Sequence, residues 1–409
     1  MKKIKKIVAL MLAMVFAICA LVGCGDTQTE TTTQAQASDE TTTGDAASTE
    51  KQTIKIAIAT CFSGNAARGA ETQLLGLQVA LNEIEESGYS KYYDFTIEQY
   101  DDKYDATEAV TVANKLVYQD GCNVVFGHLN AVVTIAGLSV YDEAGIPCFT
   151  PSGSAAAIVD GTHENTYLCV PQDRIMAESL IKYIVEDLGI KELGLLYSNN
   201  DQGTSGKEYC ETALTDLGLE FADEETYAVE DNDFSGQLLN MKSAGVKAVV
   251  IWGGEITQRP VMIKNIKQIL GDDCLIATDG NSSNASFIEA TTVEDRAGVI
   301  YPSAWSPSFT DERSQKYVEE FKALDSQGGT PGAVTVRFYD GLYLLATALN
   351  DLGPYDVNAD DFTEKLNEAI KNASYTGLQG EMKPQADGEC LASSYIVTYG
   401  DDGNETLIK

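Results

Sequence analysis

The stretch that decides the fold is Ile54-Lys55-Ile56-Ala57-Ile58-Ala59. It alternates at first and then runs apolar, as a strand does when it enters a buried sheet. The next segment carries apolar residues at helical spacing, at Leu74, Leu77, Leu81 and Ile84. Further strands are predicted at residues 95–100, 123–126, 147–150, 193–197, 248–252 and 274–276, with helices at 106–116, 132–143, 207–217, 234–244 and 260–270.

This alternation of strands and helices predicts an α/β fold with parallel sheets covered by helices on both faces. A second set of units begins near residue 176, and the roughly 355 residues concerned exceed what one core usually supports. Two doubly wound lobes are therefore expected. In open sheets of this kind, ligands bind beyond the carboxyl ends of the strands, so the loops after the strands form the candidate site.

The N-terminus has the pattern of a bacterial lipoprotein signal. Four lysines, Lys2, Lys3, Lys5 and Lys6, precede an uncharged apolar run over residues 7–22, and Gly23-Cys24 follows. The alternative is a plain transmembrane anchor, which is disfavoured because the run is shorter than the roughly 20 residues of a spanning helix. We expect residues 1–23 to be a signal peptide, Cys24 to carry the lipid, and residues 24–53 to be a disordered acidic tether rich in Thr and Ala. The protein would then be extracytoplasmic, anchored to the outer face of the cell membrane.

Composition argues against several classes of function. The formal net charge of −34 disfavours nucleic acid as a partner. Seven cysteines beyond Cys19 and Cys24 lie without CxxC pairs, so neither a zinc site nor a disulfide framework is predicted. The histidines are His128 and His163, and no nucleophile elbow or phosphate-binding loop is present. We therefore expect a protein that is not an enzyme and that uses no cofactor or metal.

A set of short motifs points to a known family. The motifs are Tyr100-Asp101-Asp102-Lys103-Tyr104-Asp105, Val124-Val125-Phe126-Gly127-His128, Ala144-Gly145-Ile146-Pro147, Thr150-Pro151-Ser152 and Tyr339-Asp340-Gly341. In order and spacing they resemble the branched-chain amino-acid (Leu/Ile/Val) substrate-binding proteins of ABC transporters, which have the type I periplasmic binding protein, or Venus-flytrap, fold. The resemblance implies three hinge crossovers, with one lobe at residues 54–172 and 302–390 and the other at 173–301 and 391–409.

The resemblance also implies a ligand site on the first of these lobes. Asn130 and Ala131 fall at the helix start that meets the ligand carboxylate in the family, although the family's serine hydroxyl is lost at Ala131. In the loop that follows the next strand, Ser152 would offer its carbonyl to an ammonium, and after Gly153 the hydroxyl and amide of Ser154 would contact the ligand. Two alternatives stay open, namely that Asn130 merely caps its helix and that the loop is an ordinary turn.

Three residues of the other lobe, together with Arg68, complete the predicted site. Asp279 falls at the family's ammonium-binding acid, with a simple turn as the alternative. Glu255 falls where the family often has an aromatic residue, so it is either a partner for a cationic ligand or a solvated charge. Gln202 falls near the sequence position of a ligand-facing tyrosine in the family. Arg68 would replace the lost contact with the ligand carboxylate, unless its side chain is solvated. The pocket should be more polar than one built for leucine.

Together these expectations define a function. The protein should capture an amino acid or a similar small polar or cationic solute between its lobes by hinge closure. It would act as a monomer and deliver the solute to the permease and ATPase subunits of an ABC importer. A ligand-sensing receptor subunit for a membrane kinase or chemoreceptor would have the same fold, so that alternative stays open.

Overall fold

Strand β1 (Gln52–Thr60) is the strand predicted at residues 54–59. The computed structural model describes residues 50–409 of the 409-residue chain, except residue 284 and residues 392–393, and these belong to one compact unit. The predicted signal peptide, the lipid attachment at Cys24 and the tether up to residue 49 lie outside the described residues. At its other end the predicted tether is slightly too long, because β1 already begins at Gln52.

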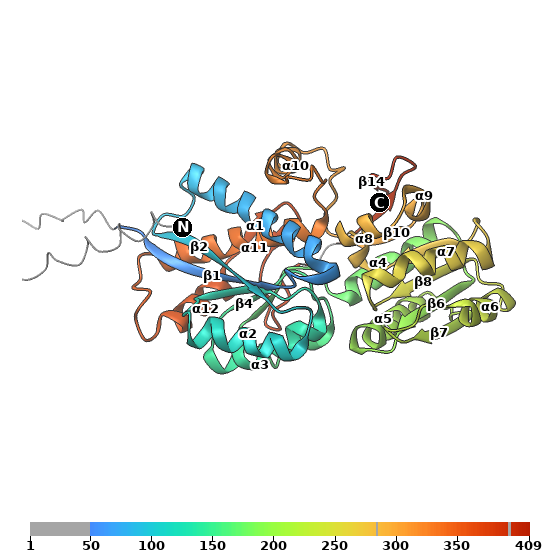
Figure 1. Cartoon of the computed structure of the whole chain (residues 1–409), viewed down its shortest axis with the longest axis horizontal. Helices are drawn as coiled ribbons and strands as arrows, with labels where there is room; N and C mark the ends of the chain where they lie inside the picture. The colour runs from blue at the N-terminus through green and yellow to red at the C-terminus, as the bar shows by residue number, and fades with distance from the viewer. Residues whose placement is uncertain (1–49, 284, 392–393) are drawn as a thin grey trace, which may run out of the picture. The chain divides into compact units, whose positions relative to one another are not determined.

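The sheet that contains β1 has five strands and is entirely parallel. Its order is β2-β1-β3-β4-β5, which places β1 inside the sheet (Figure 1). The other strands are β2 (Tyr93–Asp101), β3 (Val124–Gly127), β4 (Cys148–Thr150) and β5 (Thr166–Leu168). Because the carboxyl ends of parallel strands share one edge, the loops after β1, β3 and β4 meet there. We call the part of the chain built on this sheet the first lobe.

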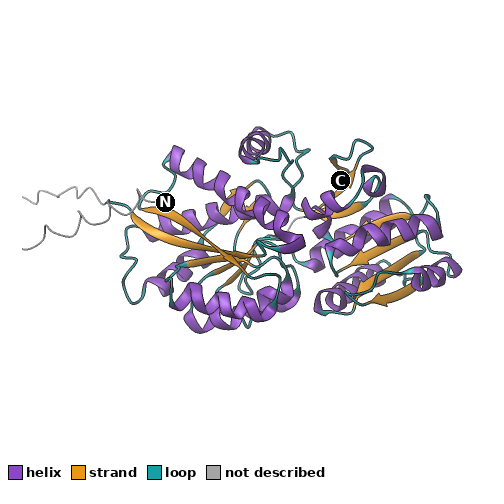
Figure 2. Cartoon of the chain, in the orientation of Figure 1, coloured by secondary structure: helices purple, strands orange, loops and turns teal. Residues whose placement is uncertain are grey.

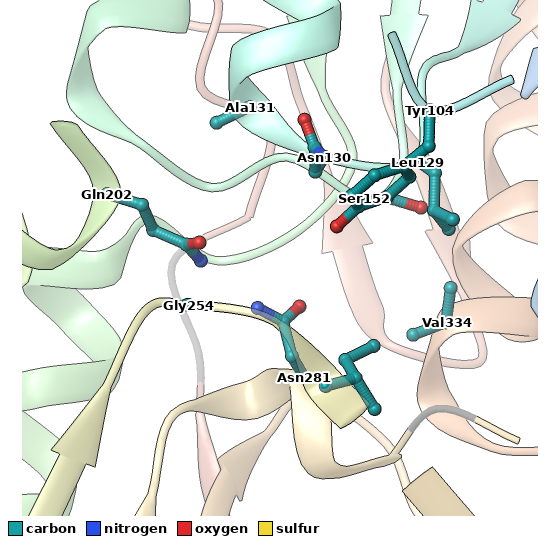
Figure 3. A pocket seen from close by; sticks show the side chains of 10 residues that line it. Tyr104, Leu129, Asn130, Ala131, Ser152, Gln202, Gly254, Asn281 and Val334 are labelled. Carbon is teal, nitrogen blue, oxygen red and sulfur yellow. The ribbon is translucent and has the colours of Figure 1, made fainter. Parts of the chain in front are cut away.

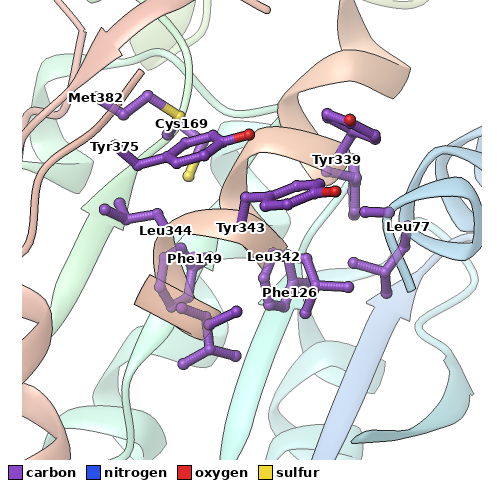
Figure 4. Close-up of a cluster of buried hydrophobic side chains, with 14 of the residues drawn as sticks. Leu77, Phe126, Phe149, Cys169, Tyr339, Leu342, Tyr343, Leu344, Tyr375 and Met382 are labelled. Atoms are coloured by element: carbon purple, nitrogen blue, oxygen red, sulfur yellow. The ribbon is translucent and has the colours of Figure 1, made fainter. Parts of the chain in front are cut away.

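Side chains of β1 alternate between two cores. Ile54, Ile56 and Ile58 join a core with α1 and α11, whereas Ala57 and Ala59 lie in a core with α2 and α3. Figure 4 shows part of the first core, where side chains of α11 contact those of β3 and β4. The helices of this lobe are α1 (Ala67–Ser87), α2 (Ala106–Tyr118), α3 (Ala131–Ala144), α10 (Glu312–Leu324), α11 (Ala333–Leu352) and α12 (Phe362–Asn372). Helices thus cover both faces of the sheet, as predicted (Figure 2).

A second sheet has seven strands in the order β14-β13-β10-β9-β8-β6-β7. Its strands are β6 (Leu193–Ser198), β7 (Asp223–Tyr227), β8 (Ala248–Trp252), β9 (Leu275–Thr278), β10 (Ile300–Ser303), β13 (Tyr395–Tyr399) and β14 (Glu405–Leu407). The predicted parallel arrangement holds from β6 to β10, whereas β13 pairs antiparallel with both β10 and β14. For β13 and β14 the reason is local, since a turn of a few residues joins them and such a turn connects antiparallel strands, whereas β13 pairs with β10 only after the chain has returned from the first lobe. The part built on this sheet is called the second lobe.

Helices cover both faces of the second sheet as well. Leu195 and Val250 lie in the core with α4 and α5, whereas Leu196 and Val249 lie in the core with α6 and α7. The helices are α4 (Asp173–Lys182), α5 (Asp201–Asp216), α6 (Ser235–Ser243), α7 (Arg259–Leu270), α8 (Ala285–Ala290) and α9 (Val293–Arg296). One prediction is wrong here, because α5 begins at Asp201 rather than at residue 207.

The chain passes between the two sheets after β5, after β10 and before β13. Strand β10 ends at Ser303, two residues beyond the lobe boundary expected at residue 301. Between β10 and β13 the chain also forms a small hairpin of β11 (Tyr375–Gly377) and β12 (Gly380–Met382). Within the described residues, no helix is long and apolar enough to cross a membrane. The cysteines of this part are free and buried, at Cys61, Cys122, Cys148, Cys169, Cys210, Cys274 and Cys390.

Candidate ligand-binding site

Two neighbouring cavities lie between the lobes at the carboxyl ends of the strands. The inner cavity has a volume of about 30 Å3 and is lined by Tyr104, Leu129, Asn130, Ala131, Ser152, Gln202, Gly254, Ile256, Asn281 and Val334 (Figure 3). The outer cavity has a volume of about 270 Å3 and is lined by Tyr104, Asp105, Ala106, Asn130, Ala131, Val132, Val133, Asn200, Gln202, Val229, Gly254 and Glu255. The inner cavity has room for about one water molecule, so an amino acid could enter only if the lobes move apart.

The start of α3 forms one wall of both cavities. Asn130 caps this helix, since its Oδ1 accepts a hydrogen bond from Val133 N at 2.8 Å. Ala131 is the first helical residue and is buried. The capping role weighed for Asn130 is therefore real, and the same residue also lines both cavities. Free N–H groups at the start of a helix favour an anion, which agrees with a polar ligand end at this wall.

The three residues predicted in the loop after β4 have different positions relative to the cavities. Ser152 lines the inner cavity, and its Oγ accepts a hydrogen bond from Gln73 Nε2 at 3.1 Å. Gly153 lets the loop approach α3 closely, because a Cβ at this position would lie 3.3 Å from Ala131 Cα and 2.7 Å from Ile158 Cδ1. Ser154 lines neither cavity, and its carbonyl oxygen instead accepts a hydrogen bond from Asp173 N at 3.4 Å.

Gln202 reaches the cavities from the first turn of α5. Asn200 caps that helix by accepting a hydrogen bond from Gly203 N at 2.9 Å, and this cap explains why the helix starts earlier than predicted. Gln202 lines both cavities and faces the first lobe in Figure 3. A residue on a capped helix is held more firmly than one on a loop, so Gln202 is a well-positioned polar group.

Tyr104 and Glu255 approach each other from opposite lobes. The Tyr104 hydroxyl interacts electrostatically with the Glu255 carboxyl across the cleft, and Asn130 lines both cavities together with Tyr104. Burial raises the pKa of Tyr104, and burial likewise raises the pKa of the Glu255 carboxyl. Glu255 is thus a half-buried carboxylate at the cleft, not a solvated loop charge. Tyr104 is part of the family motif at residues 100–105, but its contact with the second lobe was not predicted from the sequence.

Backbone strain places Tyr104 in the cleft. Lys103 and Tyr104 have φ angles of 54° and 62°, in the left-handed region that residues other than glycine rarely adopt. Neighbouring carboxylates hold this loop: Asp102 Oδ1 accepts a hydrogen bond from Tyr104 N at 2.9 Å, and Asp101 Oδ1 accepts one from Lys103 N at 3.0 Å. On its other side, Asp102 Oδ2 lies 2.7 Å from Nδ1 of the buried His128.

Cys61, Asp101 and Asp102 could in principle hold a metal ion, since one ligand atom of each lies within 4.8 Å of the others. Each of the three side chains already has a hydrogen-bond partner in the protein. The Cys61 thiol donates to Ser63 O at 2.9 Å, and Asp101 Oδ1 also accepts a hydrogen bond from Phe62 N at 3.0 Å. We therefore interpret the group as the support of the Tyr104 loop.

Asp279 is buried beside Arg259 and lines neither cavity. Arg259 Nη2 lies 2.7 and 2.6 Å from its two carboxylate oxygens. Oδ2 also accepts a hydrogen bond from Gly253 N at 2.8 Å, and Oδ1 accepts one from Asn281 N at 2.9 Å. A carboxylate has about four acceptor positions, and all are used here. A ligand ammonium could contact Asp279 only by displacing Arg259, a partner that the sequence analysis did not consider.

Arg68 is likewise occupied. Its Nη2 lies 2.5 Å from Asp325 Oδ2 and its Nε lies 3.2 Å from Glu289 Oε1, so it joins the first lobe to the second. It lines a separate cavity of about 490 Å3 rather than either of the two described above. The carboxylate contact that the sequence suggested for Arg68 is therefore already filled by acidic residues of the protein itself.

Six of the residues that line the inner cavity were not selected from the sequence. Besides Tyr104 they are Leu129, Gly254, Ile256, Asn281 and Val334. Asn281 could have been found from its place beside Asp279 after a strand. Val334 could not, because it comes from the start of α11, far along the chain from the other residues of the first-lobe wall.

Comparison with known proteins decides the family. A model of the periplasmic binding protein family matches residues 53–404. The chain belongs to this family. It is 24% identical over 358 residues to the leucine-, isoleucine-, valine-, threonine- and alanine-binding protein of Pseudomonas aeruginosa, with 87% of this chain and 92% of the relative covered. It is 27% identical over 349 residues to Leu/Ile/Val-binding protein homolog 1 of Brucella abortus, with 84% and 90% covered.

Solved structures of the family have the same fold. The branched-chain amino-acid transporter substrate-binding protein LivJ of Streptococcus pneumoniae, in complex with isoleucine, matches with a TM-score of 0.76 at 21% identity, covering 88% of this chain and 100% of LivJ. An ABC transporter solute-binding protein of R. palustris, in complex with benzoate, matches with a TM-score of 0.73 at 18% identity, covering 87% and 95%. The type I periplasmic binding protein fold and the resemblance to the branched-chain amino-acid binding proteins are thereby confirmed.

Proposed function

We propose that the protein is the extracytoplasmic solute-binding lipoprotein of an ABC importer and that it captures an amino acid between its lobes. Membership of the periplasmic binding protein family supports this, as do the names of the relatives, which bind leucine, isoleucine and valine. The partners would be the permease and ATPase subunits of the importer. Lipid on Cys24 would hold the protein at the outer face of the cell membrane.

The observation that carries the proposal is Glu255 at the cleft. Two carboxylates line the outer cavity, and Asp105 is one of them, but its Oδ1 caps α2 by accepting hydrogen bonds from Thr107 N and Glu108 N. Glu255 is half-buried and faces Tyr104 of the other lobe. Because burial raises the pKa of Glu255, its ionised form would gain from a cation brought into the cleft. We assign the ammonium end of the ligand to Glu255 and Tyr104, in place of Asp279.

Ligand capture would follow from separation and return of the lobes. Opening breaks the interaction of Tyr104 with Glu255 and widens the inner cavity, which a ligand can then enter. Asn130, Ser152 and Gln202 offer it polar contacts from both lobes. Closing brings polar groups of both lobes onto the bound ligand, so the ligand shifts the population toward the closed form that a permease would recognise.

A thermal-shift screen tests this proposal. The purified protein is heated with each of the twenty L-amino acids and with putrescine, and at least one amino acid should raise the unfolding temperature, because a ligand that binds only the folded state stabilises it. Glu255→Gln should weaken binding at least tenfold, since a charge-assisted hydrogen bond contributes about 1.5–3 kcal/mol.

The matched control is Glu230→Gln, because Glu230 is an exposed carboxylate of the same lobe and lines neither cavity. It should bind like the unmodified protein. The proposal would be refuted by a screen in which no amino acid stabilises the protein. The assignment of Glu255 would be refuted by equal binding of the Glu255→Gln variant.

A further inference from the structure

Arg337 is a buried cation that lies outside the two cavities. It lies on α11 and is only 1% exposed. Among the described residues its one hydrogen bond runs from Nη1 to Pro151 O at 3.4 Å, which is long, and its buried Nε has no partner. A guanidinium remains protonated at neutral pH, so this charge is carried into the interior.

The surroundings of Arg337 place it directly behind the wall of the inner cavity. Pro151, which accepts its hydrogen bond, is followed by the cavity residue Ser152. A Cβ built on Gly280 would lie 3.9 Å from Arg337 Nη2, and Gly280 is followed by the cavity residue Asn281. Val334, one helical turn before Arg337, lines the same cavity.

The cover over Arg337 therefore comes from both lobes. Ser152 belongs to the loop after β4 of the first sheet, and Asn281 belongs to the segment after β9 of the second sheet. Movement of the second lobe away from the first would take Gly280 and Asn281 with it. The guanidinium would then face the widened cavity.

Nearby carboxylates compensate this charge only in part. Asp279 acts on Arg337 through space, but its oxygens are used by Arg259, Gly253 N and Asn281 N. Asp173 also acts through space, yet its Oδ1 has no hydrogen-bond partner and its Oδ2 lies 3.5 Å from Trp252 Nε1. Burial raises the pKa of Asp173 to about 7, so part of its negative charge is lost near neutral pH. A buried cation without a hydrogen-bonded anion is costly.

We propose that Arg337 binds the carboxylate group of the ligand and makes the cleft selective for carboxylates. The inference rests on the proposed function and adds the second end of the ligand, because Glu255 receives the ammonium and Arg337 the carboxylate. It also accounts for one departure from the family pattern, because the hydroxyl donor lost at Ala131 is replaced by a stronger, charged donor. Arg68, the other candidate for this contact, is held by Asp325 and Glu289.

A cycle of ligand and protein changes tests the inference. Calorimetric titrations compare L-leucine with L-leucinamide, and L-lysine with L-lysinamide, on the unmodified protein and on Arg337→Met. Each amino acid that binds the unmodified protein should bind Arg337→Met at least tenfold more weakly, whereas its amide should change less than threefold. The difference between acid and amide should therefore largely disappear in the variant.

The stability of the free protein distinguishes this role from a structural one. Without ligand, Arg337→Met should unfold at the same temperature as the unmodified protein or at a higher one, because an uncompensated buried charge is removed and methionine fills most of the space. Arg337→Lys keeps the charge but cannot donate two parallel hydrogen bonds to a carboxylate, so it should retain part of the preference for the amino acid over its amide. Equal weakening of acid and amide, or marked destabilisation of the free Arg337→Met protein, would overturn the proposal.

Benzoate, a carboxylate without an ammonium group, separates this inference from the proposed function. Binding of benzoate that depends on Arg337, with no amino acid bound, would refute amino-acid capture and support the anion site. Amino-acid binding that is unchanged in Arg337→Met would refute the anion site and support amino-acid capture. If no carboxylate among these probes binds the unmodified protein, the anion site is refuted.

Discussion

The buried pair of Arg259 and Asp279 gives the sharpest prediction about stability. If Asp279 were the ligand's ammonium partner, as the family pattern suggests, its replacement would weaken binding and leave folding almost unchanged. The structure instead predicts that replacement of Asp279 mainly reduces the stability of the fold. The perturbation we consider is a double-mutant cycle of Arg259→Met and Asp279→Asn, measured on the ligand-free protein.

The magnitude follows from the burial and contacts of the two side chains. Their exposures are only 1% and 2%, and the ion pair is closed at 2.6 Å. Removal of one partner from such a pair leaves the other charge buried and uncompensated, at a cost of about 3–5 kcal/mol. Asparagine can still accept one of the two backbone hydrogen bonds, from Gly253 N or from Asn281 N, and this change is the same in the single and the double variant. The double variant should therefore cost less than the two single variants together, by at least about 2 kcal/mol.

Urea unfolding at 25 °C measures the four free energies. An exposed pair, Lys365 with Glu368 at 3.1 Å, serves as control, and its cycle of Lys365→Met and Glu368→Gln should show coupling below about 0.5 kcal/mol. The reasoning would be refuted if Asp279→Asn lay within about 1 kcal/mol of the unmodified protein and abolished amino-acid binding. That result would return the ammonium site to Asp279.

Two further predictions concern stability. Gly76→Ala should destabilise the protein by about 1–3 kcal/mol in urea unfolding, because its Cβ would lie 2.2 Å from Thr335 O where α1 meets α11. As a control, the Cβ of Gly236→Ala on α6 would meet nothing within 4 Å, and this variant should stabilise the protein by up to about 1 kcal/mol. Equal effects of the two substitutions on stability would contradict the close approach of α1 and α11. Burial raises the pKa of Glu405 to about 7, so its stabilisation of the fold is complete below the unfolded value of about 4.3 and is lost as the pH rises through 7. The free energy of unfolding should therefore fall less between pH 5 and pH 8 in Glu405→Gln than in the unmodified protein, and parallel pH profiles would argue against this effect.

The elements with strong local patterns were predictable from the sequence. Residues 54–59 encode a buried strand because the side chains of residues 56–59 are apolar on both faces, and the capped amphipathic helices are recognised by spacing alone. The short strands β13 and β14 were missed, since strands of only three to five residues carry little pattern. The start of α5 was misplaced because Gly203, usually a turn former, lies inside its first turn.

The site was less predictable because long-range contacts decide it. Arg68 lies in the first turn of α1, and nothing near it in sequence shows that its guanidinium pairs with Asp325, 257 residues away. Asp279 fits the family position, yet its pairing with Arg259 depends on how α7 and the segment after β9 meet. Local spacing could place these residues at the correct edge of the sheets, but it could not show which polar groups were already paired.

The most direct test of the central claim is a calorimetric titration of the purified protein with the amino acid that stabilises it most in the thermal screen. We predict one binding site per chain, with an affinity reduced at least tenfold by Glu255→Gln and unchanged by Glu230→Gln. Absence of saturable binding by any amino acid, or equal affinity in the Glu255→Gln variant, would contradict it.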